Sequence, residues 1–315
     1  MLLLEQMLVL FLIMCVGYYS YRKEIITDEV NQKLSAIVVN IANPAMVLSS
    51  GMGDEKVQMQ ELLIMAILAV AVFAALILLA SFLPMLFRLE KRSWGAYRTM
   101  TVFGNIGFMG FPIISAIYGE GALLYATTFI IALNVLIYTY GISVMRAIPE
   151  GAETSLQSEG KKKAPWSEIR KIFNIGVVAC ILTLIIYLLD IPMPAFVQKT
   201  TSMLGGMTAP LSMLVIGASL AGMNLKSLLT DKKLIAFVLF RLLAIPAVGL
   251  LAIRQFIGDE LILGVCMVML ATPIASMTTM LARQYGGDHE LTARGVALST
   301  ILSVATMPLI QMMFL

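Results

Sequence analysis

The sequence predicts an all-α polytopic membrane protein, with ten transmembrane helices in two inverted five-helix repeats. Of its 315 residues, 59% are hydrophobic and 13% are charged, whereas soluble domains contain about 45–50% apolar and about 25% charged residues. The mean hydropathy of +0.91 arises from apolar runs along the whole chain, which excludes a soluble domain on a single anchor. A pattern of prolines and glycines that occurs in both halves of the chain indicates the repeat.

Ten segments are apolar enough to cross a bilayer, for which about 20 residues are needed. The run LLIMAILAVAVFAALILLASFL at 62–83 is apolar on all sides, which fits a helix and not the alternating strands of a β-barrel. Glu5 stands where a secretion signal would have a basic start, so the first segment is retained as a span. The predicted spans are residues 4–21, 33–51, 61–87, 97–118, 122–146, 170–189, 200–222, 232–254, 260–283 and 291–314.

The basic residues predict the orientation, because loops rich in Lys and Arg stay in the cytoplasm. Eighteen of the 22 Lys and Arg lie in connections that follow odd-numbered spans. Both termini are therefore expected on the extracytoplasmic side of a multi-pass protein of the plasma membrane. The net charge of +3 reports this topology and gives no reason to expect a nucleic-acid partner.

The longest connection, residues 147–169, is polar and contains Gly, Pro, Ser and three consecutive lysines. Such a composition builds no core, so we expect a cytoplasmic linker, with a regulatory docking site as the alternative. The linker divides the chain into a first five-helix repeat, residues 1–146, and a second five-helix repeat, residues 170–315.

Matched patterns in chain order support the internal repeat. A proline is followed seven residues later by a glycine both in span two, NPAMVLSSG (43–51), and in span seven, APLSMLVIG (209–217). Spans four and nine share Pro-Ile-x-Ser, as FPIIS (111–115) and TPIAS (272–276), and spans five and ten carry IALNVLI and VALSTIL. Because each half has an odd number of spans, the second copy enters the membrane from the opposite side, which makes the repeat inverted.

Spans four and nine also contain residues that interrupt a helix. Span four reads GNIGFMGFP (104–112), where glycines and Pro112 weaken the helix, and span nine reads LATPIASMTT (270–279). A half-helix that begins at such a break directs free N–H groups toward the membrane centre, where they can bind an anion. Inverted repeats with interrupted helices at matching positions are typical of secondary transporters, although each break alone also fits a packing kink.

At these residues the chain resembles the auxin efflux carrier family, which includes plant PIN-FORMED auxin exporters and bacterial permeases for malate and malonate. The resemblance rests on Asn105, on the pattern Met109-Gly110-x-Pro112, and on the spacing from Pro273 to Tyr285. Further matches in the other spans are Tyr118-Gly119-Glu120, Asn134 and Pro44, so that all ten spans are covered.

The resemblance implies a scaffold domain, a transport domain with a crossover of broken helices four and nine, elevator-like movement and a homodimer. One departure concerns the second break: the plant exporters have a second proline in the ninth helix where this chain has Thr278. The second break is therefore expected to be softer or to be centred nearer Pro273.

Polar residues near the breaks are the candidate substrate ligands. A membrane-embedded amide is either a link between helices or a ligand, and the resemblance favours the ligand for two of the asparagines. Ser and Thr in membrane helices commonly bond only their own backbone. We expect Arg241 to extend its charged end to the cytoplasmic interface. The predicted substrate-binding residues are Asn43, Asn105, Gly110, Pro112, Asn134, Pro273, Ser276 and Thr278.

Residues for chemistry or proton transfer are missing from the predicted spans. The acidic residues lie in connections or at span ends, and the single histidine, His289, lies in the last connection. No catalytic motif and no Cys/His cluster occurs, so no enzyme, metal site or cofactor is expected. A carried anion should therefore respond to the membrane potential, with sodium coupling through Asn, Ser and Thr oxygens as an alternative.

The function expected from these observations is secondary transport of a small organic carboxylate by alternating access, with the bilayer and a second copy of the chain as partners. The alternative is a membrane receptor or scaffold that binds a small ligand without moving it.

Overall fold

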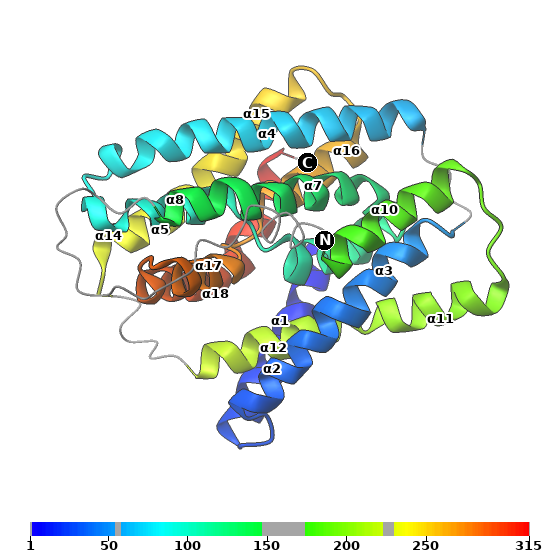
Figure 1. The fold of residues 1–315 in the computed structure, drawn as a ribbon, viewed down its shortest axis with the longest axis horizontal. Helices are drawn as coiled ribbons and strands as arrows, with labels where there is room; N and C mark the ends of the chain where they lie inside the picture. Colours follow the sequence, from blue (N-terminus) through cyan, green and yellow to red (C-terminus); the bar gives the residue numbers. More distant parts are fainter. Residues whose placement is uncertain (1, 54–57, 147–173, 223–229, 315) are drawn as a thin grey trace.

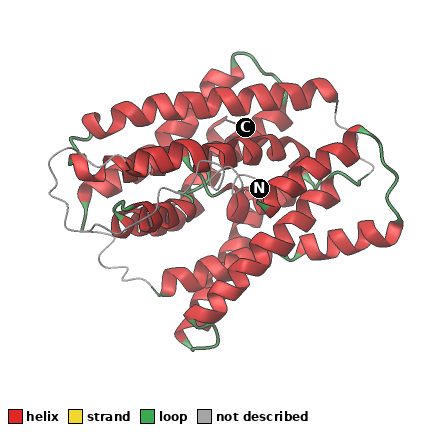
Figure 2. Ribbon diagram, viewed as in Figure 1, coloured by secondary structure: helices red, strands yellow, loops and turns green. Residues whose placement is uncertain are grey.

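The computed structural model describes residues 2–53, 58–146, 174–222 and 230–314, and most of these residues are helical (Figure 2). The predicted linker, residues 147–169, lies outside the described part of the chain. Helices occupy each of the ten predicted ranges, so the all-α prediction is confirmed.

In the first half the helices are α1 (Leu2–Arg22), α2 (Asp28–Ile37), α3 (Asn43–Ser50), α4 (Met59–Leu86), α5 (Trp94–Val102), α6 (Phe111–Tyr118), α7 (Leu123–Leu136) and α8 (Ile142–Arg146). In the second half they are α10 (Ile175–Leu188), α11 (Ala195–Gly206), α12 (Thr208–Ala221), α14 (Lys232–Leu239), α15 (Ile245–Arg254), α16 (Glu260–Ala271), α17 (Met277–Tyr285) and α18 (His289–Phe314). Six described helical stretches are long and apolar enough to cross a membrane: Asp28–Ser50, Met59–Leu86, Leu123–Arg146, Ala195–Ala221, Lys232–Arg254 and His289–Phe314.

Wide π-helical turns interrupt several of these helices. They are η1 (Val38–Ala42), η3 (Ile106–Gly110), η4 (Ile137–Gly141) and η5 (Phe240–Ala244). Three of them, η1, η3 and η5, end two residues before a proline, at Pro44, Pro112 and Pro246. A proline donates no backbone hydrogen bond and its ring crowds the turn before it, so the preceding turn widens.

The described helices pack into two groups, which lie on different sides of the view in Figure 1. The small bundle consists of α1, α2, α3, α10, α11 and α12. The crossing bundle consists of α4 to α8 and α14 to α18. Each bundle contains helices from both halves of the chain, so the two halves of the sequence interleave in space.

The small bundle is held by an unusually close contact between α1 and α12. A Cβ atom added to Gly17 would lie 2.3 Å from the carbonyl oxygen of Leu214, and one added to Gly217 would lie 1.9 Å from that of Met14. Only glycine permits the two backbones to come so close. The glycine of the predicted proline–glycine repeat in span seven is therefore used for helix packing.

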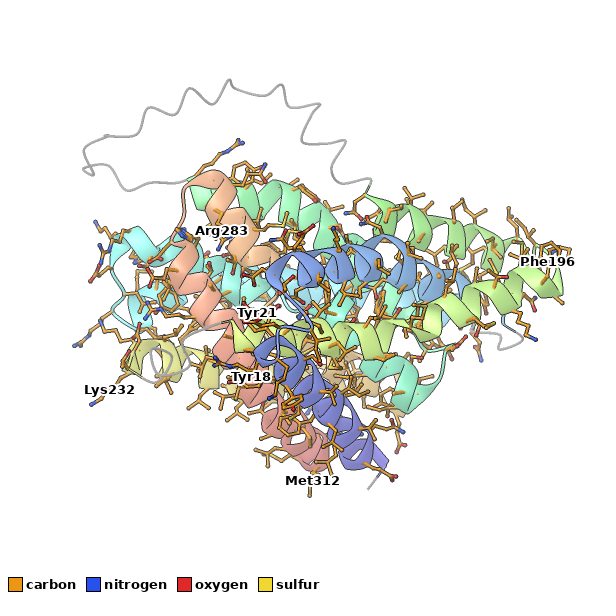
Figure 3. The ribbon with its side chains drawn as sticks, turned by 90° about the horizontal axis from the view of Figure 1, so that it is seen from below. Tyr18, Tyr21, Phe196, Lys232, Arg283 and Met312 are labelled. Carbon is orange, nitrogen blue, oxygen red and sulfur yellow. The ribbon has the colours of Figure 1, made fainter. Side chains whose placement is uncertain are left out.

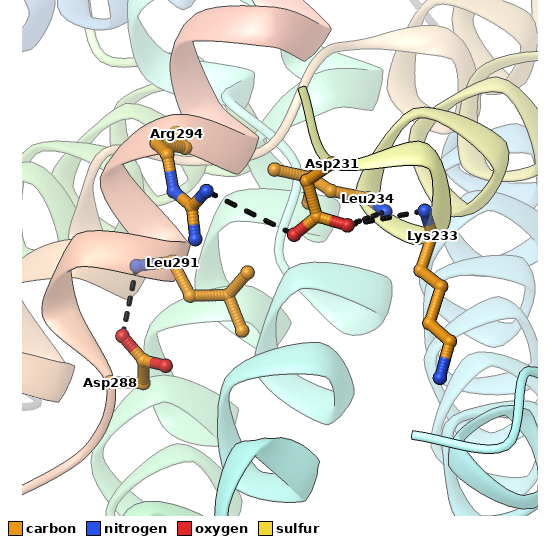
Figure 4. Close-up of polar contacts among 6 residues, drawn as sticks. All are labelled: Asp231, Lys233, Leu234, Asp288, Leu291 and Arg294. Atoms are coloured by element: carbon orange, nitrogen blue, oxygen red, sulfur yellow. Dashed lines mark hydrogen bonds and ion pairs between the residues drawn. The ribbon is translucent and has the colours of Figure 1, made fainter. Parts of the chain in front are cut away.

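In the crossing bundle, acidic side chains begin the helices at one end. The Asp231 carboxylate accepts hydrogen bonds from backbone N–H groups in the first turn of α14, and Asp288 does the same at the start of α18 (Figure 4). Arg294 of α18 lies 3.9 Å from Asp231, so the beginnings of the two helices are adjacent. Carboxylates at these positions satisfy helix N–H groups that have no partner within the helix.

Candidate functional site

The two interrupted segments break after α5 and after α16. Both helices end in extended backbone, with φ −97° and ψ 107° at Phe103 and with φ −55° and ψ 143° at Thr272. The second break covers residues 272–276 and so lies near Pro273, and Thr278 lies in the following helix α17. The first break occurs earlier in its segment than Pro112, which lies in α6 beyond η3.

The two breaks are hydrogen-bonded to one another. The backbone N–H of Asn105 donates to the carbonyl of Pro273 at 2.7 Å, and the N–H of Ala275 donates to the carbonyl of Phe103 at 3.0 Å. The residues between these pairs form an isolated antiparallel bridge, Gly104 with Ile274. Backbone groups that each break leaves without a helical partner are thus satisfied by the other, as burial within a membrane protein requires.

Gly104 makes this close approach sterically feasible. A Cβ atom at Gly104 would lie 2.5 Å from the hydroxyl oxygen of Thr272 and 3.4 Å from Nη2 of Arg241. The first of these distances is too short for two non-bonded atoms. A side chain at this position would therefore push the two breaks apart.

The second break is held by side chains from neighbouring helices. The hydroxyl oxygen of Ser299, in α18, accepts a hydrogen bond from the N–H of Ile274 at 3.0 Å. The guanidinium of Arg241, in η5, donates from Nη1 to the carbonyl of Leu270 at 2.7 Å. These two contacts attach the second break to both of the helices beside it.

The prediction that Arg241 extends to the cytoplasmic interface is wrong. Its side chain is 1% exposed and reaches the last turn of α16 in the interior of the crossing bundle. The spacing from Lys232 and Lys233 suggested a route to the surface, but the wide turn η5 instead turns this residue toward the breaks. The buried hydrogen bond replaces the water that the charge would otherwise require.

A cavity of about 520 Å³ lies beside the bridge, between the small bundle and the crossing bundle. The small bundle contributes residues from α2, α3, α10 and α12 and from η1, and the crossing bundle contributes both breaks and parts of α7 and α18. Its polar lining residues are Ser35, Asn43, Asn105, Asn134, Tyr138, Asn174, Ser219, Ser276 and Thr300. The volume falls within the range of about 300–1,000 Å³ that is usual for small-molecule sites.

None of the described residues that line this cavity is Asp, Glu, Lys, Arg or His. The remaining walls are mostly aliphatic or aromatic, including Ile106, Phe108, Leu133 and Ile216. A ligand in the cavity can therefore be recognised by amides, hydroxyls and backbone groups at one polar region, and by apolar contact elsewhere. Among the described residues, moreover, no group of three His, Cys, Asp or Glu is placed to hold a metal ion.

Two of the predicted ligands have polar groups that are not used elsewhere in the described structure. The side-chain amide of Asn105 lines the cavity and makes no hydrogen bond with the residues that the structure describes. The same is true of the hydroxyl of Ser276, which is exposed. One comes from each break, so both breaks present a free polar group to the same space.

The other two predicted residues in the cavity connect the bundles. Asn43 of the small bundle donates to the carbonyl of Gly107 at 3.1 Å, and its own Oδ1 is buried without a partner in the described structure. Asn134 of α7 accepts a hydrogen bond at 2.5 Å from Asn174, which also begins α10. Further from the cavity, Ser202 of α11 donates to the Glu120 carboxylate at 3.5 Å.

Four of the predicted site residues do not line the cavity. Gly110 and Pro112 follow the first break, in η3 and in α6. Pro273 lies in the second break, where its carbonyl accepts the bridge hydrogen bond from Asn105. The hydroxyl of Thr278 donates to the carbonyl of Ala275 at 2.7 Å, which is the backbone bond that membrane threonines commonly make. The predicted site residues that do line the cavity are Asn43, Asn105, Asn134 and Ser276.

Sequence reasoning missed Asn174 and Thr300, which both line the cavity. Asn174 precedes an apolar run, and the sequence there indicates only a helix N-cap. Its hydrogen bond to Asn134 depends on the packing of α10 against α7, which the local sequence does not reveal. Thr300 lies in VALSTIL, the segment that the repeat pairs with the segment of Asn134. Residue by residue, however, the predicted repeat pairs Asn134 with Ser299 and Val135 with Thr300, so it gives no signal for Thr300.

The N-terminal ends of two helical segments face the cavity. Helical structure resumes at η3 and α17, and residues Ile106, Gly107 and Met277 at these N-terminal ends line the cavity. Helix N-termini carry partial positive charge and free N–H groups, which favour anions. The cavity therefore combines two helix N-termini with the free Asn105 amide.

Comparison with known proteins gives one matching family and two full-length relatives. The model of a family described as membrane transport proteins matches residues 2–311. An uncharacterized transporter, MJ1031, of Methanocaldococcus jannaschii is 25% identical over 310 residues, covering 97% of each chain. An uncharacterized transporter of Methanothermobacter thermautotrophicus is 21% identical over 306 residues, covering 97% of this chain and 96% of its own.

Proposed function

The chain belongs to the family of membrane transport proteins that includes the auxin efflux carriers, and on that premise we propose that it is a secondary carrier of a small organic carboxylate. The carboxylate binds in the cavity beside the two breaks and is exposed alternately to each side of the membrane. The crossing bundle carries it by an elevator-like movement against the small bundle.

The observation that carries this proposal is the free Asn105 amide in a cavity that two helix N-termini face. Amide N–H groups and helix N-termini are donors, and a carboxylate is an acceptor that can take several hydrogen bonds at once. The apolar remainder of the wall fits the carbon skeleton of the substrate. The free Ser276 hydroxyl on the second break adds a further donor.

The proposed topology has ten membrane crossings in two inverted repeats, residues 1–146 and 170–315, joined by a cytoplasmic linker at 147–169. In support, Lys232 and Arg283 of two connections predicted to be cytoplasmic lie toward one end of the molecule (Figure 3). Phe196, next to a connection predicted to be external, lies at the opposite end. The termini are then extracytoplasmic, the membrane is the plasma membrane, and the carrier assembles as a homodimer.

Binding and movement are tested in two steps. The purified protein is screened with a panel of organic acids for thermal stabilisation, because a ligand that binds only the folded protein raises its melting temperature. Each stabilising acid is then measured for flux into proteoliposomes, with the Asn105→Ala variant beside the parent. A carrier gives flux that the variant reduces, whereas the alternative receptor or scaffold gives stabilisation without flux.

The energy coupling follows from the uncharged lining of the cavity. A carboxylate that crosses without a neutralising group moves charge, and the membrane potential then contributes about 2.3 kcal/mol per charge per 100 mV. A potential imposed with potassium and valinomycin should therefore shift the flux when no pH gradient is present. Flux that follows only a pH gradient would mean that a proton travels with the substrate.

A further inference from the structure

Arg241 is a buried cation that makes no direct contact with a ligand in the cavity. It lies in η5, is 1% exposed and does not line the cavity. Its Nη1 donates to the carbonyl of Leu270 at 2.7 Å, and its Nε is buried without a partner among the residues that the structure describes. A guanidinium stays protonated in proteins. The crossing bundle therefore contains a fixed positive charge with no acidic partner in the described part of the chain.

The charge is located at the C-terminal ends of two half-helices. Leu270 belongs to the last turn of α16, and Gly104 follows the end of α5. Nη2 of Arg241 lies 3.4 Å from the position that a Cβ of Gly104 would take. Helix C-termini carry partial negative charge, so a cation here offsets the negative ends of both broken helices.

Gly104 separates this charge from the cavity. It lines the cavity and at the same time adjoins the guanidinium on its other side. The N-terminal ends of η3 and α17 face the cavity directly, through Ile106 and Met277. Arg241 lies near the negative ends of the two broken helices, and the positive ends of η3 and α17 face the cavity. We therefore expect a positive electrostatic potential in the cavity although its lining is uncharged.

We propose that Arg241 is a positioning residue that gives the cavity its preference for anions, by offsetting the negative ends of the two broken helices. This inference rests on the proposed function in that an anion is the expected substrate. The potential itself, however, is a property of the cavity that can be measured without transport. In the alternative role, Arg241 is only a hydrogen-bonding link between η5 and α16.

Two substitutions separate the charge from the hydrogen bond. Arg241→Lys keeps a cation, and Arg241→Gln keeps an N–H donor for Leu270 but removes the charge. Arg254→Gln is the matched control, because Arg254 lies on the same segment, donates to a backbone carbonyl at 3.2 Å and is exposed. Size-exclusion chromatography and melting temperature establish that each variant is folded.

The potential is read from a cysteine placed in the cavity at Ser276→Cys, or at Met280→Cys as a second reporter, since both residues line the cavity and are exposed. The background replaces the three native cysteines, Cys15, Cys180 and Cys266. The probes are an anionic sulfonatoethyl and a cationic trimethylammonioethyl methanethiosulfonate. The ratio of their reaction rates cancels changes in thiolate fraction or access and reports the local potential.

The proposal predicts that Arg241→Gln lowers the anion-to-cation rate ratio by about tenfold or more at both reporters, as expected when a unit charge is removed from a buried site. Arg241→Lys and Arg254→Gln should stay near the ratio of the parent. An unchanged ratio in Arg241→Gln would overturn the proposal and leave only the linking role. Failure of both reporters to react with either probe would overturn it too, because charged molecules would then not enter the cavity.

The result also separates this inference from the proposed function. A shifted ratio in a protein that shows no flux supports the role of Arg241 and contradicts transport. Flux with an unchanged ratio supports transport and contradicts the role of Arg241. The rate ratio is measured without knowledge of the natural substrate, whereas flux is measured with the acids that stabilise the protein.

Discussion

The two breaks lie in the predicted spans four and nine, but the residues around them have different roles. The second break is attached on both sides, since Ser299 accepts from the N–H of Ile274 and Arg241 donates to Leu270. In the first break, Phe103 and Asn105 bond across the bridge, and the carbonyls of Gly104 and Asn105 accept from N–H groups of η3 in the same segment. This break presents the free Asn105 amide to the cavity. We therefore propose that the second break mainly fixes the geometry of the crossing and that the first break supplies the main ligand-binding group.

In the proposed repeat, such a division would allow the two segments to diverge while the crossing is kept. The bridge needs two extended segments and a glycine at Gly104, and both halves supply the extended segments. Once one break is fixed by its neighbours, the other can use its polar groups for a ligand. Substitutions in the two breaks should therefore change different measured quantities.

The largest effect is expected from a change that separates the two breaks. Gly104→Val places a side chain against Thr272 and Arg241, and overpacking of this kind costs about 1–3 kcal/mol of unfolding free energy. We expect a lower melting temperature and loss of flux. Gly206→Val is the control, because a Cβ at Gly206 meets no atom within 4 Å. A Gly104→Val protein that melts and transports like the parent would contradict the close crossing.

Removal of the free amide should affect binding and leave folding intact. Asn105→Ala takes away a donor to a charged ligand, worth about 1.5–3 kcal/mol, so affinity for a stabilising acid should fall by about tenfold to a hundredfold. The melting temperature without ligand should change little. Asn40→Ala, which removes an exposed amide bonded to Ala36, serves as the control. Equal affinities of Asn105→Ala and the parent, from isothermal titration, would remove Asn105 from the site.

The anchored break should respond in the opposite way. Ser299→Ala leaves the N–H of Ile274 buried without a partner, which costs about 1–3 kcal/mol. Stability should fall while ligand affinity stays near that of the parent. Ser303→Ala is a matched control on the same helix, since its hydroxyl only donates to a helix carbonyl, that of Thr300. If Ser299→Ala weakened binding as much as Asn105→Ala does, the division between the two breaks would be lost.

The smallest effect is expected at Pro112. The sequence pattern suggested that this proline opens the helix, but the break ends before Ile106 and Pro112 lies in α6. Pro112→Ala restores a backbone donor and lets η3 tighten, while the bridge remains in place. Melting temperature and flux should therefore change less than in Gly104→Val or Asn105→Ala. A loss of flux equal to that of Gly104→Val would show that the wide turn is itself required.

Hydropathy predicted where helices occur better than where they begin. The second and seventh predicted spans start at residues 33 and 200, whereas the helices start at Asp28 and Ala195. The first turn of α2 is polar but still helical, with Thr27 accepting a hydrogen bond from the N–H of Val30. Helix α11 begins ahead of the polar pair Gln198 and Lys199, which interrupts the apolar run. Hydropathy identifies the part of a helix that is apolar enough for lipid, but the helix itself extends beyond that part.

The sequence predicted which types of polar residue line the cavity, but only some of the individual residues. Glycine, proline and asparagine in the repeated segments led to Asn105 and Ser276, which lie in the cavity. The packing of α7 against α10, which brings Asn174 to Asn134, joins residues far apart in the chain and leaves no local pattern. The burial of Arg241 likewise depends on the turn η5, whose direction a helical spacing does not report.

Movement of the two bundles against each other is tested most directly by linking them away from the cavity. Ser202 and Glu120 lie on different bundles, are in hydrogen-bonding contact and do not line the cavity. In a background without native cysteines, Ser202→Cys and Glu120→Cys are linked by a short bis-methanethiosulfonate reagent, because a cysteine side chain is shorter than the glutamate that reaches Ser202. Flux and binding of the same acid are measured before and after the link is cleaved by reduction. The account predicts that the linked protein binds the acid but gives no flux until it is reduced. Flux that continues unchanged in fully linked protein would contradict it.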